Sequence, residues 1–274
     1  MSAVAEITDE EVRSLTQSIL TRYGIDFTCY EPKSLKRRII RTMSVFDFVS
    51  IFELWSRLLK DTQFIYSFMN EISVGMTSMF RDPVLWRQLK QMLPQEYKNQ
   101  DNISIWHSGC STGEEVYTMG IVMKEVGLLA QAKALATDIN QNALETAQLG
   151  EYHKIKLVEN ERNYGEYSTF GNFTRYYTTD GKTGLMNKEL VQNVTFRYHN
   201  LITDAFVGQY DIIFCRNVMI YFDQIAKSKL LEKFHMSLKP GGYFIIGFYD
   251  TMLSIVDQKR FRLVNESAKI FKKI

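Results

Sequence analysis

Residues 103–119 read ISIWHSGCSTGEEVYTM, and this stretch decides the fold class. Residues 103–107 form a strand-length apolar run, and residues 114–126 have helical spacing. Gly109 and Gly113 stand between the two, where a residue without a side chain permits a tight turn and a close approach of the backbone to a ligand. We therefore expect a strand, a glycine turn and a helix in immediate succession.

The same alternation continues to the end of the chain. A second short strand is expected at 134–137, and it is followed by the helical segment INQNALETAQL at 139–149. Strands that alternate with helices predict an α/β fold, with a largely parallel sheet covered on both faces. Further strands are expected at 194–198, 210–215 and 243–248, a helix at 224–238, and a closing antiparallel pair at 260–265 and 268–274.

Two stretches depart from this alternation. Residues 1–75 show hydrophobic spacing near 3.6, which predicts a helical N-terminal domain. Residues 160–192 are rich in Tyr, Thr, Asn and Gly with little helical periodicity, and they predict a small inserted β unit. We therefore expect a first domain over 1–75 and a second over 76–274 that contains the insert.

The composition is that of an ordinary globular protein and narrows the classes of function. Of 274 residues, 45% are hydrophobic and 23% charged, and 33 basic against 31 acidic side chains give a net charge of +2. A charge so near zero predicts no nucleic-acid partner. No apolar run approaches the roughly 18 residues of a membrane span. Because the first residues also lack a secretory signal, we expect a cytoplasmic protein without membrane insertion.

Neither the cysteines nor the histidines form a ligand pattern. Cys29, Cys110 and Cys215 are widely spaced, which argues against a disulfide framework and against a zinc site. The four histidines never stand three or four residues apart. We expect no metal in this protein.

Residues 33–43, KSLKRRIIRTM, combine basic and apolar side chains without an acid. On a helix, Leu35, Ile39 and Met43 share one face, and Pro32 suits the helix start. The basic side chains have two interpretations, either a solvated face or a docking surface for an acidic partner. The docking interpretation assigns Lys33, Arg37, Arg38 and Arg41.

An acid stands at the end of the second expected strand. In a doubly wound sheet, ligands bind outside the carboxyl ends of the strands, and a carboxylate about 20 residues past the glycine turn accepts ribose hydroxyls. Asp138 ends the second expected strand about 25 residues past Gly113, and together with the glycine turn it fits any nucleoside cofactor. The alternative is that Asp138 only caps the helix that follows.

Several segments together carry a resemblance to a known family. They are YGIDFTCYEPKSLKRRI at 23–39, MTSMFRDP at 76–83, WHSGCSTGEEVYTM at 106–119 and FCRNVMIYF at 214–222. In this order the segments resemble the CheR family of S-adenosylmethionine-dependent methyltransferases, which modify glutamates of chemotaxis receptors. The resemblance covers nearly the whole chain.

The resemblance implies a fold, a cofactor and a partner. The fold is a helical N-terminal domain followed by a class I, Rossmann-like methyltransferase domain with a small inserted antiparallel β unit. The cofactor is S-adenosyl-L-methionine, with S-adenosyl-L-homocysteine as product. The partner is the cytoplasmic domain of a chemotaxis receptor.

The resemblance also implies site residues. Arg81 and Tyr221 match the positions near the transferred methyl group and are the expected catalytic residues. The expected cofactor contacts are Thr77, Arg81, Gly109, Glu115, Asp138, Asn200, Leu201, Arg216 and Asn217.

This chemistry requires positioning more than proton transfer. A glutamate carboxylate has a pKa of about 4.3 and is ionised at neutral pH, so no general base is needed. Catalysis then depends on holding the carboxylate in line with the methyl group. An arginine can fix the acceptor carboxylate, and a tyrosine hydroxyl can orient it.

Three departures from the family pattern leave a second function class open. Gly75 stands where the family usually has asparagine, His107 replaces a small residue, and residues 247–250 read GFYD instead of GHSE. The alternative function is a non-catalytic or regulatory module that binds S-adenosylmethionine and docks a signalling partner.

Overall fold

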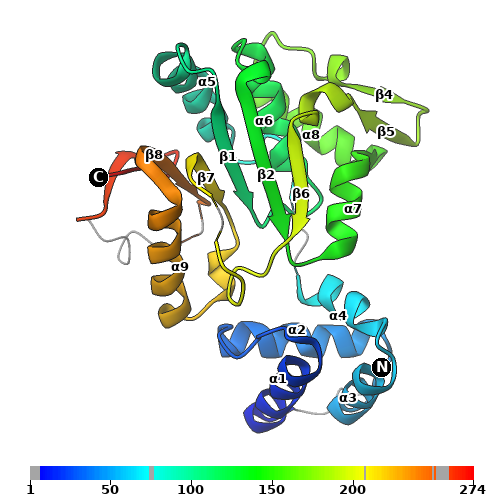
Figure 1. Ribbon diagram of the computed structural model, residues 1–274. Coiled ribbons are helices and arrows are strands. Elements are labelled where there is room, and N and C mark those ends of the chain that lie inside the picture. Colours follow the sequence, from blue (N-terminus) through cyan, green and yellow to red (C-terminus); the bar gives the residue numbers. More distant parts are fainter. Residues whose placement is uncertain (1–6, 74–76, 207, 249, 251–258) are drawn as a thin grey trace.

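The computed structural model describes residues 7–73, 77–206, 208–248, 250 and 259–274. Its first part is helical and lies below the sheet of the second part in Figure 1. The expected helical character of the N-terminal residues is confirmed by α1 (Asp9–Tyr23), α2 (Pro32–Val45), α3 (Ile51–Lys60) and α4 (Phe64–Ile72).

Local sequence explains where the first two helices begin and end. Thr8 and Glu11 form a capping box at the start of α1, and Gly24 ends the helix with a left-handed φ of 68°. Helix α2 starts at Pro32, as expected, and the side chain of Glu31 accepts hydrogen bonds from the first backbone N–H groups. The apolar stripe of α2, including Leu35 and Ile39, is buried in the core of the helical part.

The second part contains a seven-stranded sheet in the order β6-β2-β1-β7-β8-β10-β9. Strands β6, β2, β1, β7 and β8 run parallel, and β10 pairs antiparallel with β8 and β9. The expected parallel sheet and its antiparallel closing pair are thus confirmed. The strand bounds are β1 Ile103–Ser108, β2 Ala132–Asp138, β6 Val194–Tyr198, β7 Tyr210–Cys215, β8 Leu238–Ile246, β9 Phe261–Asn265 and β10 Ile270–Lys273.

Helices cover both faces of this sheet. Strand β1 sends Ile105 into the cluster that contains Trp86 of α5 and Val116 of α6, while its neighbour Trp106 packs on Phe234 of α9 on the opposite face. Because both faces are covered at the centre of the sheet, β1 and β7 are buried along almost their whole length. The helices are α5 Pro83–Tyr97, α6 Glu114–Glu125, α7 Gln141–Leu149 and α9 Gln224–Ser237, with short 3-10 turns η1 Leu129–Gln131, η3 Lys188–Val191 and η4 Met219–Tyr221.

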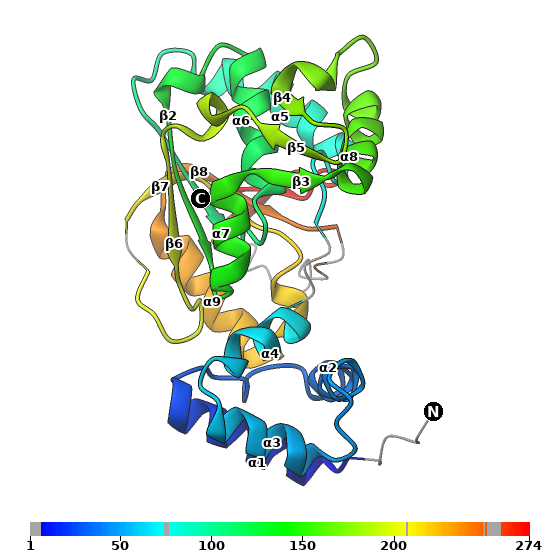
Figure 2. The ribbon, with the colours of Figure 1, turned by 90° about the vertical axis from the view of Figure 1, so that its right-hand side faces the viewer.

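The inserted unit differs in part from the sequence expectation. It contains a small antiparallel sheet in the order β3-β5-β4 (β3 Glu151–His153, β5 Thr183–Met186, β4 Tyr177–Thr179) and the turn η2 (Phe173–Tyr176). Its longest element is a helix, α8 (Lys154–Tyr167), so the absence of helix expected for 160–167 is wrong. The buried face of α8 includes tyrosines and a buried asparagine, Asn160, which conceals the apolar period. Figure 2 shows the unit on the side of α6 and α7.

One carboxylate fastens the inserted unit to the sheet domain. Glu125, at the end of α6, accepts hydrogen bonds of 2.7–2.9 Å from the hydroxyls of Tyr164, Tyr167 and Tyr176, and from Nζ of Lys90 at 2.7 Å. Burial would raise the pKa of Glu125, but the hydrogen bonds from Lys90 and the tyrosines outweigh it and lower the pKa. The carboxylate is therefore most stable in its ionised form.

None of the helices in the described ranges combines the length and the apolar content needed to cross a bilayer.

We predict that Glu125→Gln destabilises the protein by roughly 1.5–3 kcal/mol at neutral pH, the range of a charge-assisted hydrogen bond. The folded pKa is lower than the ordinary value of 4.5, so this stabilisation is fully present above 4.5 and is lost as the pH falls through the folded pKa. Urea unfolding as a function of pH measures the difference.

The matched control is Glu189→Gln. Glu189 pairs with Lys124 at 2.6 Å, but its side chain is 54% exposed. This substitution should cost at most about 1 kcal/mol. Equal losses for both variants would contradict the special role of Glu125.

Candidate functional site

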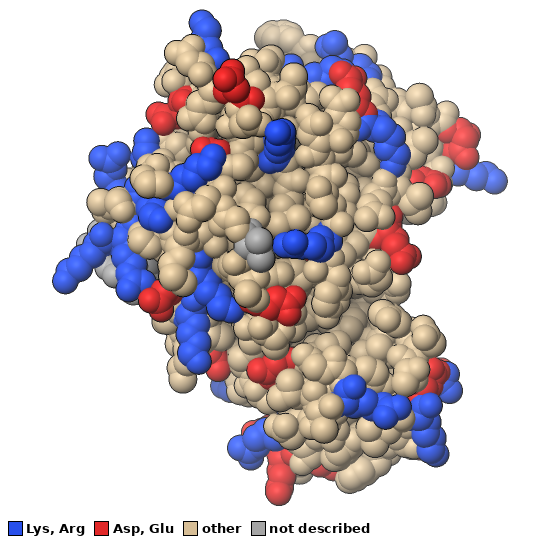
Figure 3. All heavy atoms as spheres, viewed as in Figure 1, with Lys and Arg blue, Asp and Glu red and all other residues tan. Residues whose placement is uncertain are grey.

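A cavity of about 650 Å³ lies at the carboxyl ends of the parallel strands, between the sheet and the helical part. Figure 3 shows the hollow between the larger and the smaller part of the molecule. Every residue expected to hold the cofactor or to act in catalysis lines this one cavity, although these residues come from five separate segments. They are Thr77, Arg81, Gly109, Glu115, Asp138, Asn200, Leu201, Arg216, Asn217 and Tyr221.

The glycine turn after β1 is closely packed. The N–H groups of Gly109 and Cys110 both donate to the carbonyl of Thr137 at 2.8 Å, which binds the turn to the end of β2. Gly109 has a φ of 77°, and a Cβ at this position would lie 2.3 Å from Cγ2 of Val218. The turn therefore requires glycine both for its conformation and for space.

Asp138 ends β2, and the backbone holds its carboxylate at the wall of the cavity. Oδ2 accepts from the N–H of Ser111 at 2.8 Å, and Oδ1 accepts from the N–H of Asn140 at 2.9 Å. Burial raises the pKa of Asp138, and these hydrogen bonds limit the rise. The helix-cap alternative is wrong, because Asn140 caps α7 by accepting from the N–H of Ala143.

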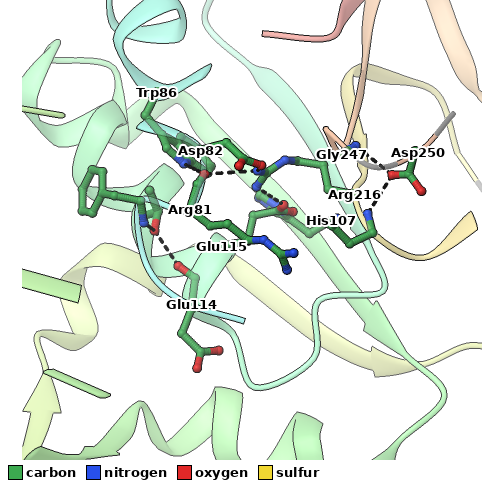
Figure 4. A network of polar contacts seen from close by, with 12 residues as sticks. Arg81, Asp82, Trp86, His107, Glu114, Glu115, Arg216, Gly247 and Asp250 are labelled. Atoms are coloured by element: carbon green, nitrogen blue, oxygen red, sulfur yellow. Dashed lines mark hydrogen bonds and ion pairs between the residues drawn. The ribbon is translucent and has the colours of Figure 1, made fainter. Parts of the chain in front are cut away.

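Glu115 lies between two basic side chains (Figure 4). Its Oε1 is 2.8 Å from Nδ1 of His107, and its Oε2 accepts from Nη1 of Arg216 at 3.1 Å. His107 is buried and stacks on Phe214 with ring centroids 4.7 Å apart. Burial would raise the pKa of Glu115, but the hydrogen bond with His107 and the charge of Arg216 lower it. The large residue at position 107 thus contributes to keeping Glu115 ionised.

Arg216 also fixes the loop that carries Arg81. Its Nη2 donates to Oδ2 of Asp82 at 2.7 Å and to the carbonyl of Arg81 at 3.1 Å, and Nε1 of Trp86 donates to the same carbonyl at 2.9 Å. Phe80 and Asp82 have φ values of 54° and 58°, which non-glycine residues rarely adopt. Such strain is sustained only where surrounding contacts hold it.

The segment 247–250, a departure from the family pattern, supports Asn217. Oδ2 of Asp250 accepts from the N–H of Asn217 at 2.7 Å and from the N–H of Gly247 at 2.8 Å. Asn217 has a φ of 59°, so an acceptor at its N–H stabilises an unusual conformation. Burial raises the pKa of Asp250. Two other departures, Gly75 and Tyr249, lie outside the described residues.

The helical part holds Tyr221. The guanidinium of Arg38 lies 4.2 Å from the centroid of the Tyr221 ring, and the N–H of Glu31 donates to the Tyr221 carbonyl at 2.9 Å. In the opposite direction, the N–H of Asp223 donates to the carbonyl of Cys29 at 2.9 Å. Arg38 also donates to the carbonyl of Ile72. This residue is buried, so it is not on the exposed face with the other basic residues of α2.

The other three basic residues assigned to the docking surface are exposed. Lys33, Arg37 and Arg41 face solvent, and Arg37 also lines the cavity. Arg41 has a weak internal contact, with Nε 3.6 Å from Oε2 of Glu71. The docking surface and the solvated face both remain compatible with this arrangement.

Comparison with known sequences places this site in a family. The family sequence model described as CheR methyltransferase, all-alpha domain, matches residues 10–73, and the one described as CheR methyltransferase, SAM binding domain, matches residues 75–270. The chain belongs to the CheR family. The expectation from the sequence segments is confirmed, and the cofactor is S-adenosylmethionine.

Individual CheR-family relatives match along nearly their whole length. The Pseudomonas putida protein Cher3, named as a methyltransferase, is 34% identical over 266 residues, which cover 97% of each chain. A chemotaxis protein methyltransferase of Listeria innocua is 30% identical over 245 residues, covering 88% of this chain and 90% of the relative. A chemotaxis protein methyltransferase of Vibrio parahaemolyticus is 29% identical over 272 residues and covers 94% of each.

The cavity of this CheR-family chain fits S-adenosylmethionine. Two half-buried carboxylates, Asp138 and Glu115, suit a ligand that carries positive charge and a ribose. The side chain of Asn217 lines the cavity, and its Nδ2 is a buried donor without a partner among the described residues. A bound ligand that supplies an acceptor would remove this unsatisfied group.

Sequence reasoning missed Asp82 and Asp250 as supports of the site, and it assigned Arg38 to the docking surface instead of to Tyr221. Asp82 and Arg38 lie inside segments that carry the resemblance, but nothing in their spacing shows that one binds Arg216 and the other covers Tyr221. Asp250 was visible as part of a departure from the family pattern, but nothing in the sequence indicated that its carboxylate binds the backbone of Asn217.

We propose that Asp138 accepts the ribose hydroxyls of the cofactor. Asp138→Ala should then weaken S-adenosylmethionine binding by roughly 1.5–3 kcal/mol, the range for hydrogen bonds to a charged group. Isothermal titration calorimetry measures the change. Asp101→Ala, at an exposed acid before β1, is the control and should bind like the parent. If a folded Asp138→Ala variant bound S-adenosylmethionine with parental affinity, the assignment of Asp138 to the ribose would be wrong.

Proposed function

We propose that this CheR-family methyltransferase transfers a methyl group to glutamate side chains on the cytoplasmic helices of a chemotaxis receptor. One observation carries the proposal: Arg81 and Tyr221 line the same cavity as the carboxylates Asp138 and Glu115. The cavity therefore combines groups for a cationic nucleoside cofactor with groups for an anionic acceptor. The names of the Listeria and Vibrio relatives support the same direction.

The cofactor side is assigned by charge and position. Asp138 suits the ribose, Glu115 suits the cationic amino end, and the backbone at Gly109 can lie against the ligand. Asn200 and Leu201 follow β6 and line the same wall. When bound, S-adenosylmethionine supplies the methyl group, and S-adenosylhomocysteine is the product.

The acceptor side is assigned to Arg81 and Tyr221. A glutamate carboxylate is ionised at neutral pH, because its pKa is about 4.3, so it attacks without help from a base. Arg81 would hold one acceptor oxygen and the Tyr221 hydroxyl would orient the carboxylate. A strong pairing with arginine lowers the reactivity of the carboxylate, so Arg81 acts as a positioning group for the acceptor. The rate enhancement then comes from orientation at near-attack distance.

Two measurements test this function against a non-catalytic binding module. Calorimetry with S-adenosylmethionine establishes binding. The parent is then incubated with methyl-labelled cofactor and the cytoplasmic fragment of its receptor, and release of label from the fragment by alkali reports carboxyl methyl esters. Alkali-labile label on glutamates supports the proposal. Tight cofactor binding with no transfer to the receptor supports the module.

We predict that Tyr221→Phe separates binding from catalysis. The substitution removes one hydroxyl and little volume, and it leaves the ring beneath Arg38. The turnover number should fall at least tenfold while the affinity for S-adenosylmethionine changes less than about twofold, a loss confined to the transition state. Steady-state kinetics together with calorimetry measure both values.

The control for this variant is Tyr66→Phe, a half-exposed tyrosine on α4 that does not line the cavity. Its turnover should equal that of the parent. If Tyr221→Phe also turned over at the parental rate, Tyr221 would have only a packing role.

We also propose that the exposed basic face of α2 guides the receptor to the cavity. The substrate helices carry glutamates, so they present an acidic surface. Lys33, Arg37 and Arg41 are exposed on one side of α2, and Arg37 also lines the cavity. Each exposed pair is worth only about 0–1 kcal/mol, but several together can steer the encounter.

Lys33→Glu combined with Arg41→Glu tests this surface without altering the cavity wall. The Michaelis constant for the receptor should rise by roughly threefold to tenfold at low salt. The difference should shrink as the Debye length falls from about 10 Å at 0.1 M to about 3 Å at 1 M salt. Affinity for S-adenosylmethionine should not change.

The control makes the same charge change at the amino ends of the strands, at the end of the sheet that lies away from the cavity. Lys98 and Lys133 are exposed near the amino ends of β1 and β2, and Lys98→Glu with Lys133→Glu should leave the receptor Michaelis constant unchanged. If the α2 variant kept parental kinetics at every salt concentration, the basic residues would be a solvated face.

A further inference from the structure

The loop from Thr77 to Asp82 carries Arg81 into the cavity, but its own sequence does not hold it in shape. Phe80 and Asp82 both have left-handed backbone conformations. Non-glycine residues in this region cost about 1–3 kcal/mol each, so neighbouring groups must hold them there. Arg216 and Trp86 hold the Asp82 end of the loop. The beginning of the loop needs other partners.

Those partners come from one face of α8 in the inserted unit. Nζ of Lys156 donates to the carbonyl of Thr77 at 2.9 Å. Oδ1 of Asn160 accepts from the N–H of Met79 at 2.8 Å. Nδ2 of Asn163 donates to the carbonyl of Met79 at 3.0 Å. Each of these groups binds main-chain atoms of the loop, so the three contacts constrain its path.

The spacing of these residues places them on a single helix face. Positions 156, 160 and 163 follow the i, i+4, i+7 pattern, so the three side chains project toward the same neighbour. Lys156 is also anchored by an ion pair of 2.8 Å with the buried Glu114 of α6. Asn163 makes a second bond, of 3.1 Å, to Oγ of Ser78. The face therefore fits the loop at successive residues.

Apolar packing joins the same two elements. The ring centroid of Phe80 lies 4.9 Å from the ring centroid of Tyr164 and 4.7 Å from that of Tyr167, and both tyrosines are on α8. The N–H of Phe80 donates to Oγ1 of Thr118 at 3.1 Å. The residue directly before Arg81 is thus inserted into the aromatic core of the inserted unit.

We infer that Lys156, Asn160 and Asn163 are positioning residues for methyl transfer, acting through the loop that carries Thr77 and Arg81. This inference rests on the role of Arg81 in the proposed function. The inserted unit then belongs to the catalytic apparatus, because its helix sets where the acceptor-binding arginine stands. Loss of the α8 contacts should loosen the loop, weaken the cofactor contact expected from Thr77 and displace Arg81.

Lys156→Met is the first test, with Lys154→Met as matched control. Both remove an ammonium from α8, but Lys154 is exposed, and its Nζ makes no hydrogen bond or ion pair within the described ranges. Lys156→Met should lower kcat at least tenfold with less than twofold change in the receptor KM, and weaken S-adenosylmethionine binding several-fold. Lys156→Arg should restore most of the parental kcat and most of the parental affinity for S-adenosylmethionine. Lys154→Met should match the parent.

Hydrogen exchange reads the loop directly and does not depend on the acceptor. The amides of Met79 and Phe80 should exchange at least tenfold faster in Lys156→Met than in the parent and in Lys154→Met. If the parent fails to methylate a receptor while the variant shows this exchange and the loss of cofactor affinity, the proposed function fails and the positioning role stands. Parental exchange, cofactor affinity and kcat in folded Lys156→Met would overturn the inference.

Asn163→Asp provides a second variant if Lys156→Met does not fold because Glu114 loses its partner. Asn163 is half-buried, and the substitution replaces two donated bonds with an acceptor that faces the Met79 carbonyl. The same faster exchange and lower kcat are expected. Parental values in this variant would contradict the inference equally.

Discussion

The site is arranged around the guanidinium of Arg216. Because this charged group is buried, it must be surrounded by hydrogen-bond acceptors. Its side chain is only 4% exposed, and its acceptors come from the first turn of α6 and from the loop before α5. Glu115 balances part of the charge, and Asp82 balances the rest while keeping a left-handed backbone. Removing Arg216 would therefore take one partner at once from Glu115, from Asp82 and from the Arg81 carbonyl. The glycine turn and the loop keep their relative positions because this charge has to be satisfied.

The two appended units take part in the site in a similar way. The helical part covers the Tyr221 ring with Arg38 and binds the Tyr221 carbonyl through Glu31. The inserted unit binds the loop before Arg81 through α8. The turns at the ends of the strands thus supply most of the expected cofactor contacts, whereas Thr77 and each of the two expected acceptor residues depend on a unit outside the sheet. A domain that binds a nucleoside cofactor becomes selective for its acceptor through such additions.

Local pattern was sufficient for the sheet and for two features of the cavity wall, the glycine turn and Asp138, whereas the other expected cofactor contacts came from the family resemblance. The run at β1, the glycine turn and the acid at Asp138 are determined by neighbouring residues, so their positions could be predicted from the sequence. Helix α8 could not be predicted, because Asn160 and its tyrosines are buried by partners distant in the chain. The same holds for Arg38, whose burial depends on Tyr221. Polar contacts between distant segments leave no periodic trace, and they make up most of the support for the acceptor side.

The short pairing between residues 29–31 and 221–223 limits how the two parts can be exchanged between relatives. In the design of a chimera, the junction after α4 is the obvious point at which to join two parents, because one family model ends and the next begins there. A helical part taken from a relative and joined at this point would lack the residues that contact Tyr221 in its own protein. We expect that a functional hybrid needs residues 29–38 and 221–223 from the same parent. Recombination is thus constrained by a contact that the linear division of the chain does not reveal, and the two parts should be inherited as a unit.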